Sequence, residues 1–266
     1  ESNETLASRF DITDIFPDCP FLNEGIAIPP RWTISRDGVF LGNRQIAHLP
    51  LIIVAIIRSE LDSRESLALA FRRHDQTQFA EIARGDLTSP RRIISLADLG
   101  IPLAAENAAE LVRYFAAFLA SNDSRLPVIS ATRRQGWHSN GLAFVWGDHI
   151  IRQNGLDGGT QLQDALRAER SQMRGILVRN QNETRGFRSR GTMRGWLDAV
   201  SLIAPYPRAQ IAVYASLAPP LLENLGMSNF VLDFAGTTSG GKTTVLSVAA
   251  SCWGCPGENA PDRIFG

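Results

Sequence analysis

The stretch that decides the fold class is Asn229-Phe230-Val231-Leu232-Asp233-Phe234-Ala235-Gly236-Thr237-Thr238-Ser239-Gly240-Gly241-Lys242-Thr243-Thr244. Its second half fits the pattern G-x-x-x-x-G-K-[ST] of a phosphate-binding loop. The apolar run at 229–235 is suited to a central parallel strand, and residues 243–253 carry apolar side chains at helical spacing. Strand, loop and helix in this order predict the start of an α/β P-loop NTPase domain.

The glycines of this loop allow backbone N–H groups to turn inward around phosphate oxygens, and the following helix adds its positive end. Lys242 is then expected to bridge the β- and γ-phosphates of ATP, and the Thr243 hydroxyl to bind Mg²⁺. The predicted nucleotide-binding residues are Gly236, Thr237, Thr238, Ser239, Gly240, Gly241, Lys242, Thr243 and Thr244.

The composition of basic residues supports this assignment, because lysine is rare in the chain and occurs in the loop. Of 27 basic residues, Lys242 is the one lysine and the other 26 are arginines, so the compact ammonium stands where a P-loop requires it. The formal net charge is zero, which excludes a global field attracting nucleic acid or membrane. Three cysteines and the lack of a signal pattern or a long apolar run indicate a cytoplasmic protein with no membrane partner. The pair Cys252 and Cys255 has the spacing of a metal or redox site, but with no second pair and no nearby histidine it is interpreted as two thiols after a helix.

Outward from the loop, four regions are expected. Residues 1–28 are an acidic leader, 29–155 an α+β N-terminal domain, 156–191 a basic linker, and 192–266 a helical segment with the P-loop strand, loop and helix. Within the N-terminal domain we expect a hairpin around Asp37-Gly38, a buried strand at 51–57, helices at 63–73 and 104–119, and strands at 91–96, 127–130, 142–146 and 149–151. Further helices are expected at 160–174, 193–202, 208–225, with a kink at Pro219-Pro220, and 243–253.

Catalysis requires more than the loop. A P-loop ATPase needs an acidic residue on a neighbouring strand and usually an arginine finger. Only 24 residues follow Lys242, so the ATPase domain is expected to be truncated and the catalytic residues to lie outside this chain. The chain begins at Glu1 without methionine, and an upstream piece is expected as well.

Eight arginines lie within residues 167–194 against two acids. A solvated basic linker is the simpler interpretation, and a grip on single-stranded DNA phosphates is the alternative. The candidate DNA-binding residues are Arg185, Arg188, Arg190 and Arg194. Arg133-Arg134 beside Trp137 form a smaller basic and aromatic cluster with the same two interpretations.

Several segments resemble the bacterial domain of unknown function 927 family. They are Pro29-Pro30-Arg31-Trp32, Asp37-Gly38-Val39, Leu111-Val112-Arg113-Tyr114, Gly136-Trp137-His138, Tyr214-Ala215-Ser216-Leu217-Ala218-Pro219-Pro220-Leu221-Leu222, the loop 236–244, and Ala249-Ala250-Ser251-Cys252-Trp253-Gly254. The resemblance implies that this chain is part of a helicase-like P-loop ATPase of the kind found in replication proteins of phages, plasmids and mobile elements. Of the family's functional residues, the resemblance assigns only those of the loop at 236–244 to positions in this chain.

The leading hypothesis is therefore the ATP-binding portion of a mobile-element or phage replicative DNA helicase, which is ring-forming in the full-length protein and acts on single-stranded or forked DNA. One alternative is a P-loop kinase or phosphotransferase, although about 190 residues before the helical segment fit a compact kinase poorly. Another is a non-catalytic DNA-binding or assembly module. Nucleotide preference and subunit number stay open.

Overall fold

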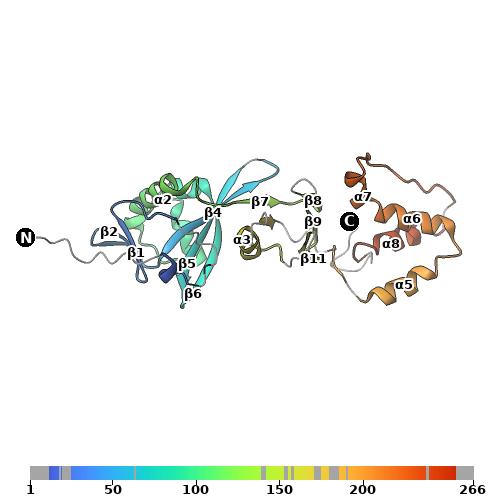
Figure 1. Cartoon of the computed structure of the whole chain (residues 1–266), viewed down its shortest axis with the longest axis horizontal. Helices are drawn as coiled ribbons and strands as arrows, with labels where there is room; N and C mark the ends of the chain where they lie inside the picture. Colours follow the sequence, from blue (N-terminus) through green and yellow to red (C-terminus); the bar gives the residue numbers. More distant parts are fainter. Residues whose placement is uncertain are drawn as a thin grey trace, which may run out of the picture. The chain divides into compact units, whose positions relative to one another are not determined.

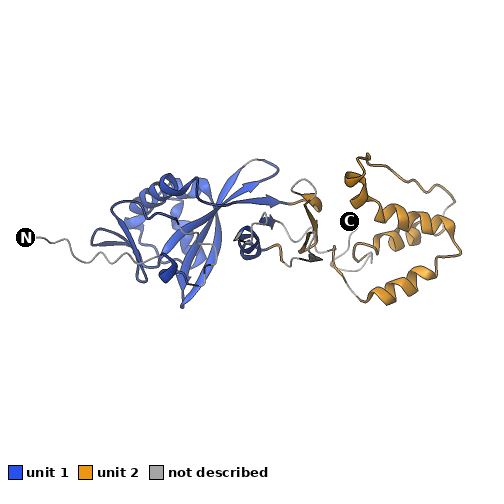
Figure 2. Cartoon of the chain, viewed as in Figure 1, with its two compact units in different colours: residues 1–132, 161–177 blue, residues 133–160, 178–266 orange. Residues whose placement is uncertain are grey.

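The structure is a computed structural model that describes residues 12–17, 19, 25–62, 64–138, 142–152, 155–156, 159–170, 175–179, 186–189, 191–237 and 240–255. The chain divides into two compact units (Figure 2). Unit 1 comprises residues 1–132 and 161–177, and unit 2 comprises residues 133–160 and 178–266. Unit 1 is thus discontinuous in sequence, and the expected domain boundary at 155 lies inside the segment that interrupts it.

A five-stranded mixed sheet forms the centre of unit 1, in the order β12-β7-β4-β5-β6. Its strands are β4 (Leu51–Ser59), β5 (Glu65–Arg73), β6 (Gln76–Ala83), β7 (Val128–Thr132) and β12 (Ile176–Val178). Strand β5 pairs antiparallel with both β4 and β6, whereas β7 lies parallel to β4, with Ile129 opposite Ile57. The predicted strands at 51–57 and 127–130 are confirmed, and the unit has the mixed character expected of it.

Two predictions in this unit are wrong. Residues 63–73 were expected as a helix from Leu67, Ala70 and Phe71, but residues 65–73 form β5, buried without interruption from Ser66 to Phe71. A strand covered on both faces shows no alternation, and its leucines and alanines then imitate helical spacing. Residues 91–96 were expected as a strand, but they lead into a 3₁₀ helix, η2 (Ile93–Leu99). Its two buried residues, Ile93 and Leu96, have the three-residue spacing of that helix.

A smaller antiparallel sheet precedes the large one. It consists of β1 (Trp32–Ser35), β2 (Gly38–Leu41) and β3 (Arg44–Ala47). The hairpin expected at Asp37-Gly38 is confirmed, with Ser35 paired to Gly38. Gly38 has φ of +144°, and a Cβ there would strike the carbonyl oxygen of Ala47, so this position needs glycine on both counts.

Helices complete unit 1 (Figure 1). They are α1 (Ile12–Ile15), the 3₁₀ helices η1 (Arg84–Thr88) and η3 (Ala105–Asn107), α2 (Ala108–Asn122) and α3 (Leu162–Arg170). The helix expected at 104–119 is thereby found with shifted ends, and the one expected at 160–174 is found over 162–170, while residues 171–174 lie outside the described residues. The face of α2 that contains Leu111, Phe115 and Phe118 is fully buried in the core, as its periodicity predicts.

Two polar side chains of α2 are tied to backbone groups far away in the sequence. The Tyr114 hydroxyl donates to the Leu51 carbonyl of β4 at 2.7 Å. The Asn122 side chain accepts from the Ala27 N–H at 2.7 Å and donates to the carbonyls of Ala27 and Phe118 at 2.8 and 2.9 Å. Both side chains are fully buried, so these bonds fix the position of α2 against the start of β4 and the segment around Ala27.

We expect Tyr114→Phe to lower the free energy of unfolding by about 1–2 kcal/mol at neutral pH, because the Leu51 carbonyl loses a buried partner. Burial also raises the pKa of the Tyr114 phenol well above its ordinary value. The stability gained from this group is full below about pH 10 and is lost as the pH rises through the folded-state pKa. Urea titrations at neutral and alkaline pH should therefore show a shallower alkaline loss in the variant. Tyr214→Phe, at an exposed position, is the matched control.

Unit 2 combines a four-stranded antiparallel sheet with helices. The sheet order is β11-β10-β9-β8, from β8 (Gly136–His138), β9 (Ala143–Trp146), β10 (His149–Arg152) and β11 (Gly155–Leu156). The helices are α5 (Met193–Ser201), α6 (Pro207–Leu217), α7 (Pro219–Asn224) and α8 (Lys242–Ala250). The kinked helix expected at 208–225 is found as two helices, α6 and α7, and α7 starts at the Pro219-Pro220 pair where the kink was expected.

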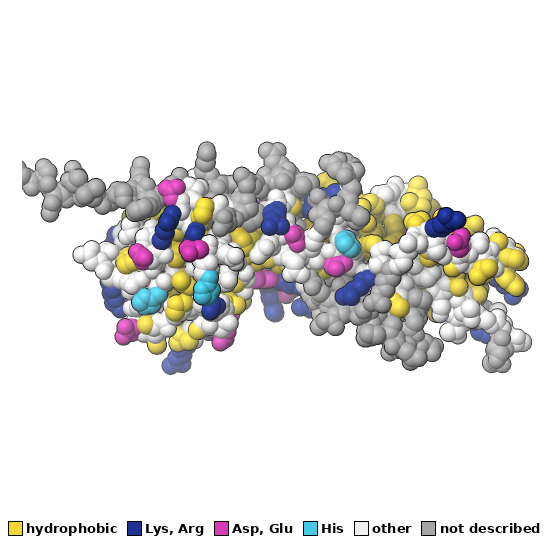
Figure 3. All heavy atoms as spheres, turned by 90° about the horizontal axis from the view of Figure 1, so that it is seen from below, with side chains coloured by type: hydrophobic (Ala, Val, Ile, Leu, Met, Phe, Trp, Pro, Cys, Tyr) yellow, Lys and Arg dark blue, Asp and Glu magenta, His cyan; other side chains and the backbone are white. Residues whose placement is uncertain are grey.

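Large apolar side chains are unusually exposed in the helical part of unit 2. Helix α5 buries no residue. Its apolar side chains Met193 and Leu197, which lie one turn apart, are 72% and 54% exposed. Figure 3, whose right-hand part is unit 2, shows hydrophobic side chains gathered on the surface there. Exposed apolar patches of this kind are a general property of surfaces that bind proteins, membranes or ligands. Among the helices of the described residues, none has the length and apolar character needed to cross a bilayer.

Candidate functional site

The predicted loop lies at the amino end of α8. Gly241 has a left-handed conformation, with φ of +77°, and the helix begins at Lys242. The first helical hydrogen bond joins the Val245 N–H to the Gly241 carbonyl at 2.9 Å. The N–H groups of Lys242, Thr243 and Thr244 precede that bond, and they point out of the positive end of the helix.

The lysine closes the loop. Its Nζ donates to the carbonyl oxygens of Gly236 at 3.0 Å and Thr237 at 2.7 Å, so the two ends of the motif meet. Lys242, Thr243 and Thr244 are exposed in the first turn of α8. An exposed ammonium that is bonded to backbone carbonyls can exchange them for phosphate oxygens. Thr238 and Ser239 lie outside the described residues.

The strand expected at 229–235 is not formed. These residues have no strand pairing in the described part of the chain, and Val231 is 96% exposed. A central parallel strand requires hydrogen-bonded neighbours on both sides, and the strands of unit 2 pair instead with one another in a separate antiparallel sheet. Within the described residues, the helix of the motif is therefore formed, and the apolar run before it belongs to no sheet.

The far end of α8 is firmly packed. Ala249 and Ala250 are buried, and the Ser216 hydroxyl of α6 donates to the Ala249 carbonyl at 2.7 Å. The Trp253 indole N–H in turn donates to the Ser216 carbonyl at 2.8 Å. Helix α8 thus has a fixed carboxyl end and a free amino end that carries the loop.

The structure describes two of the four candidate DNA-binding arginines. Arg194 is exposed in the first turn of α5, and Arg188 is exposed ahead of that helix. Arg188 also borders a cavity of about 510 Å³ with Trp196 and Cys252. Arg185 and Arg190 lie outside the described residues.

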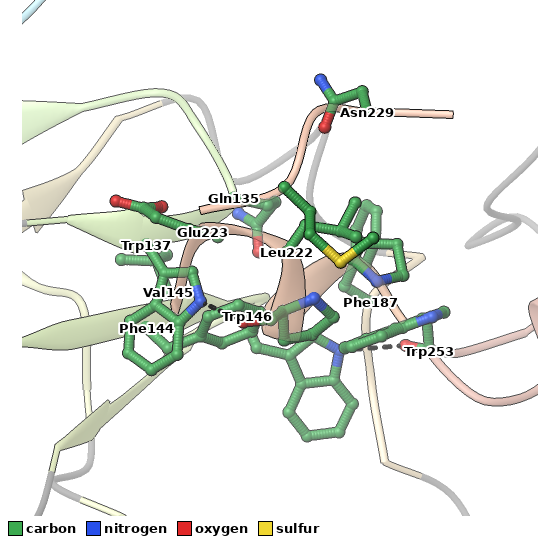
Figure 4. Close-up of a pocket in the computed structure, with 14 residues that line it drawn as sticks. Gln135, Trp137, Phe144, Val145, Trp146, Phe187, Leu222, Glu223, Asn229 and Trp253 are labelled. Atoms are coloured by element: carbon green, nitrogen blue, oxygen red, sulfur yellow. Dashed lines mark hydrogen bonds between the residues drawn. The ribbon is translucent and has the colours of Figure 1, made fainter. Parts of the chain in front are cut away.

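Sequence reasoning missed an aromatic pocket in unit 2 (Figure 4). It has a volume of about 550 Å³, within the range of about 300–1,000 Å³ usual for small-molecule sites. Its walls come from β8, β9, the start of α7 and the segment after α8, and the aromatic side chains among them are Trp137, Phe144, Trp146, Phe187 and Trp253. The one signal in the sequence is that four of the five tryptophans fall between residues 137 and 253.

Hydrogen bonds hold the indoles of this aromatic pocket in place. The N–H of Trp137 donates to the Pro220 carbonyl at 2.7 Å, and the N–H of Trp146 donates to the Trp253 carbonyl at 3.1 Å (Figure 4). Because the indole donors are engaged by backbone, the carbon surfaces of the rings remain to face the cavity. Trp137 and Phe144 meet edge to face, with centroids 5.1 Å apart.

Three polar side chains border the same pocket. Gln135 accepts from the Gly147 N–H through Oε1, while its buried Nε2 finds no hydrogen-bond partner among the described residues. Glu223 is exposed on α7, and Asn229 is exposed in the segment that follows this helix. The pocket therefore offers an unpaired amide donor and a carboxylate acceptor beside aromatic walls.

Cys19, Cys252 and Cys255 are free thiols. Burial raises the pKa of the Cys252 thiol, which disfavours its reactive thiolate form. Within the described residues, no group of three or more His, Cys, Asp or Glu side chains is placed to hold a metal ion.

These features define a mixed α/β protein with a glycine-rich loop at a helix amino end. The sequence pattern of the family "Domain of unknown function (DUF927)" matches residues 36–260, and the chain belongs to that family. The match extends over most of both units and includes the sequence of the loop at 236–244. A comparison with curated proteins finds no match.

Proposed function

We propose that this chain supplies the ATP-binding portion of a replicative DNA helicase of a phage or mobile element, acting in the cytoplasm as a ring on single-stranded or forked DNA. The observation that carries the proposal is the bonding of Lys242 Nζ to the Gly236 and Thr237 carbonyls at the open end of α8. This arrangement supports phosphate binding, with Thr243 as the Mg²⁺ ligand beside the lysine.

The exposed apolar residues of unit 2 support the assembly part of the proposal. Phe230, Val231 and Leu232 precede the loop, with exposed fractions of 50%, 96% and 42%. An apolar segment next to a phosphate-binding loop suits a strand that pairs with further strands of an ATPase sheet. The exposed side chains of α5 and α6 then suit contacts with the rest of that domain or with a neighbouring subunit.

The test is ATP hydrolysis by the full-length protein with and without single-stranded DNA. We expect DNA to stimulate hydrolysis and native mass spectrometry to show rings in the presence of ATP and Mg²⁺. If single-stranded DNA leaves the rate of ATP hydrolysis unchanged and the protein transfers phosphate to a small acceptor, the protein is a kinase and the helicase proposal is rejected.

A further inference from the structure

We propose that the aromatic pocket of unit 2 receives an unstacked base of single-stranded DNA, an inference that rests on the proposed function and names a contact site for its DNA. The pocket differs from the predicted nucleotide loop in its lining residues, since none of the described residues 236–237 and 240–244 borders it. It therefore offers a second binding site in the same unit.

The walls suit a planar aromatic ligand. Stacking on aromatic side chains is the general means by which proteins hold single-stranded bases. Trp137, Trp146 and Trp253 have their N–H groups bonded to the carbonyls of Pro220, Trp253 and Ser216. The rings are thereby fixed before a ligand arrives, which lowers the entropy lost on binding.

The polar groups suit the edge of a base. A nucleobase carries donors and acceptors side by side, and the pocket provides both complements. Gln135 Nε2 is a donor without a partner in the described part of the chain, and a small shift of the side chain lets it meet a base carbonyl or ring nitrogen. The Glu223 carboxylate accepts from an exocyclic amino or ring N–H group, and the Asn229 amide does either.

The surroundings suit the phosphates. Arg133 and Arg134 directly precede Gln135 in the sequence and are exposed, and exposed Arg188 directly follows Phe187. Arg188 also borders the neighbouring cavity, which shares Trp146 and Trp253 with the aromatic pocket. A strand with one base in the pocket can continue past these guanidinium groups.

The same charges argue against a cationic ligand. An aromatic cage for an ammonium group relies on carboxylates and on π faces free of competing cations. Here Glu223 is the single ionisable side chain among the lining residues, while three arginines flank them in sequence. A polyanion with aromatic bases matches this balance better.

The test measures tryptophan fluorescence of the whole chain at low salt during titration with single-stranded oligodeoxyadenylate or the same oligonucleotide with abasic sites. We expect the abasic strand to bind about fivefold to a hundredfold more weakly, the equivalent of one stacked base. Trp137→Leu should weaken the base-containing strand by a similar factor and leave the abasic strand unchanged. Asp198→Asn, which alters an exposed carboxylate of α5 outside the lining, is the control.

Equal binding of the two strands would overturn the proposal, as would a trimethyl-lysine peptide that binds where DNA does not. Circular dichroism reports whether Trp137→Leu folds, and the comparison of strands on the unaltered protein decides the matter even if it does not. The outcome is independent of the nucleotide loop. If ATP fails to bind while bases are still preferred to abasic sites, the helicase proposal fails and the pocket stands.

Discussion

Replacing Lys242 by alanine is expected to weaken ATP binding by about tenfold to a hundredfold, because charge-assisted bonds to phosphate are worth about 1.5–3 kcal/mol. The side chain is exposed, and its hydrogen bonds within the described residues go to the carbonyls of Gly236 and Thr237. The melting temperature of the nucleotide-free protein should therefore change as little as it does for other surface substitutions. Titration with a fluorescent ATP analogue measures the first effect, and thermal denaturation the second.

Two further variants sharpen this test. Lys242→Arg should also bind poorly, because a planar guanidinium does not fit between phosphates as a compact ammonium does. Arg208→Ala, which removes an exposed cation from the first turn of α6, should bind ATP normally. Unchanged affinity in Lys242→Ala, or a large loss of stability without nucleotide, would contradict the assignment of the loop.

Replacing Asn122 by alanine is expected to lower the free energy of unfolding by about 2–4 kcal/mol. The change removes three hydrogen bonds and leaves the N–H and carbonyl of Ala27 without their partner. Urea denaturation followed by circular dichroism measures the loss.

Asn43→Ala, at an exposed turn position of unit 1, is the matched control and should change stability by less than about 0.5 kcal/mol. If the two variants are equally stable, Asn122 does not hold the segment around Ala27 in the folded protein.

The fold could be predicted from sequence where local signals are strong. The turn at Asp37-Gly38, the periodic helix α2 and the prolines at 219 and 220 each act over a few residues, and the structure agrees with all three. Strand β5 could not be recognised, because burial on both faces erases alternation. The apolar run 229–235 has the composition of a strand, but composition does not provide a pairing partner.

The two candidate sites differ in the same way. The predicted nucleotide-binding loop is contiguous, so nine neighbouring residues specify it, and the seven that the structure describes lie at the start of α8 or just before it. The aromatic pocket draws Gln135 and Trp253 from positions more than a hundred residues apart. Spacing along the chain holds no information about such a meeting, which only folding creates.

The discontinuity of unit 1 has a consequence during synthesis on the ribosome. Strand β7 ends at Thr132, but its neighbour β12 is not made until residues 176–178. In the interval the edge of β7 has open backbone groups, a state that invites pairing with other chains. Strand β7 stays in this state while the ribosome translates residues 133–175. The speed of translation across this segment is therefore expected to affect the yield of correctly folded protein.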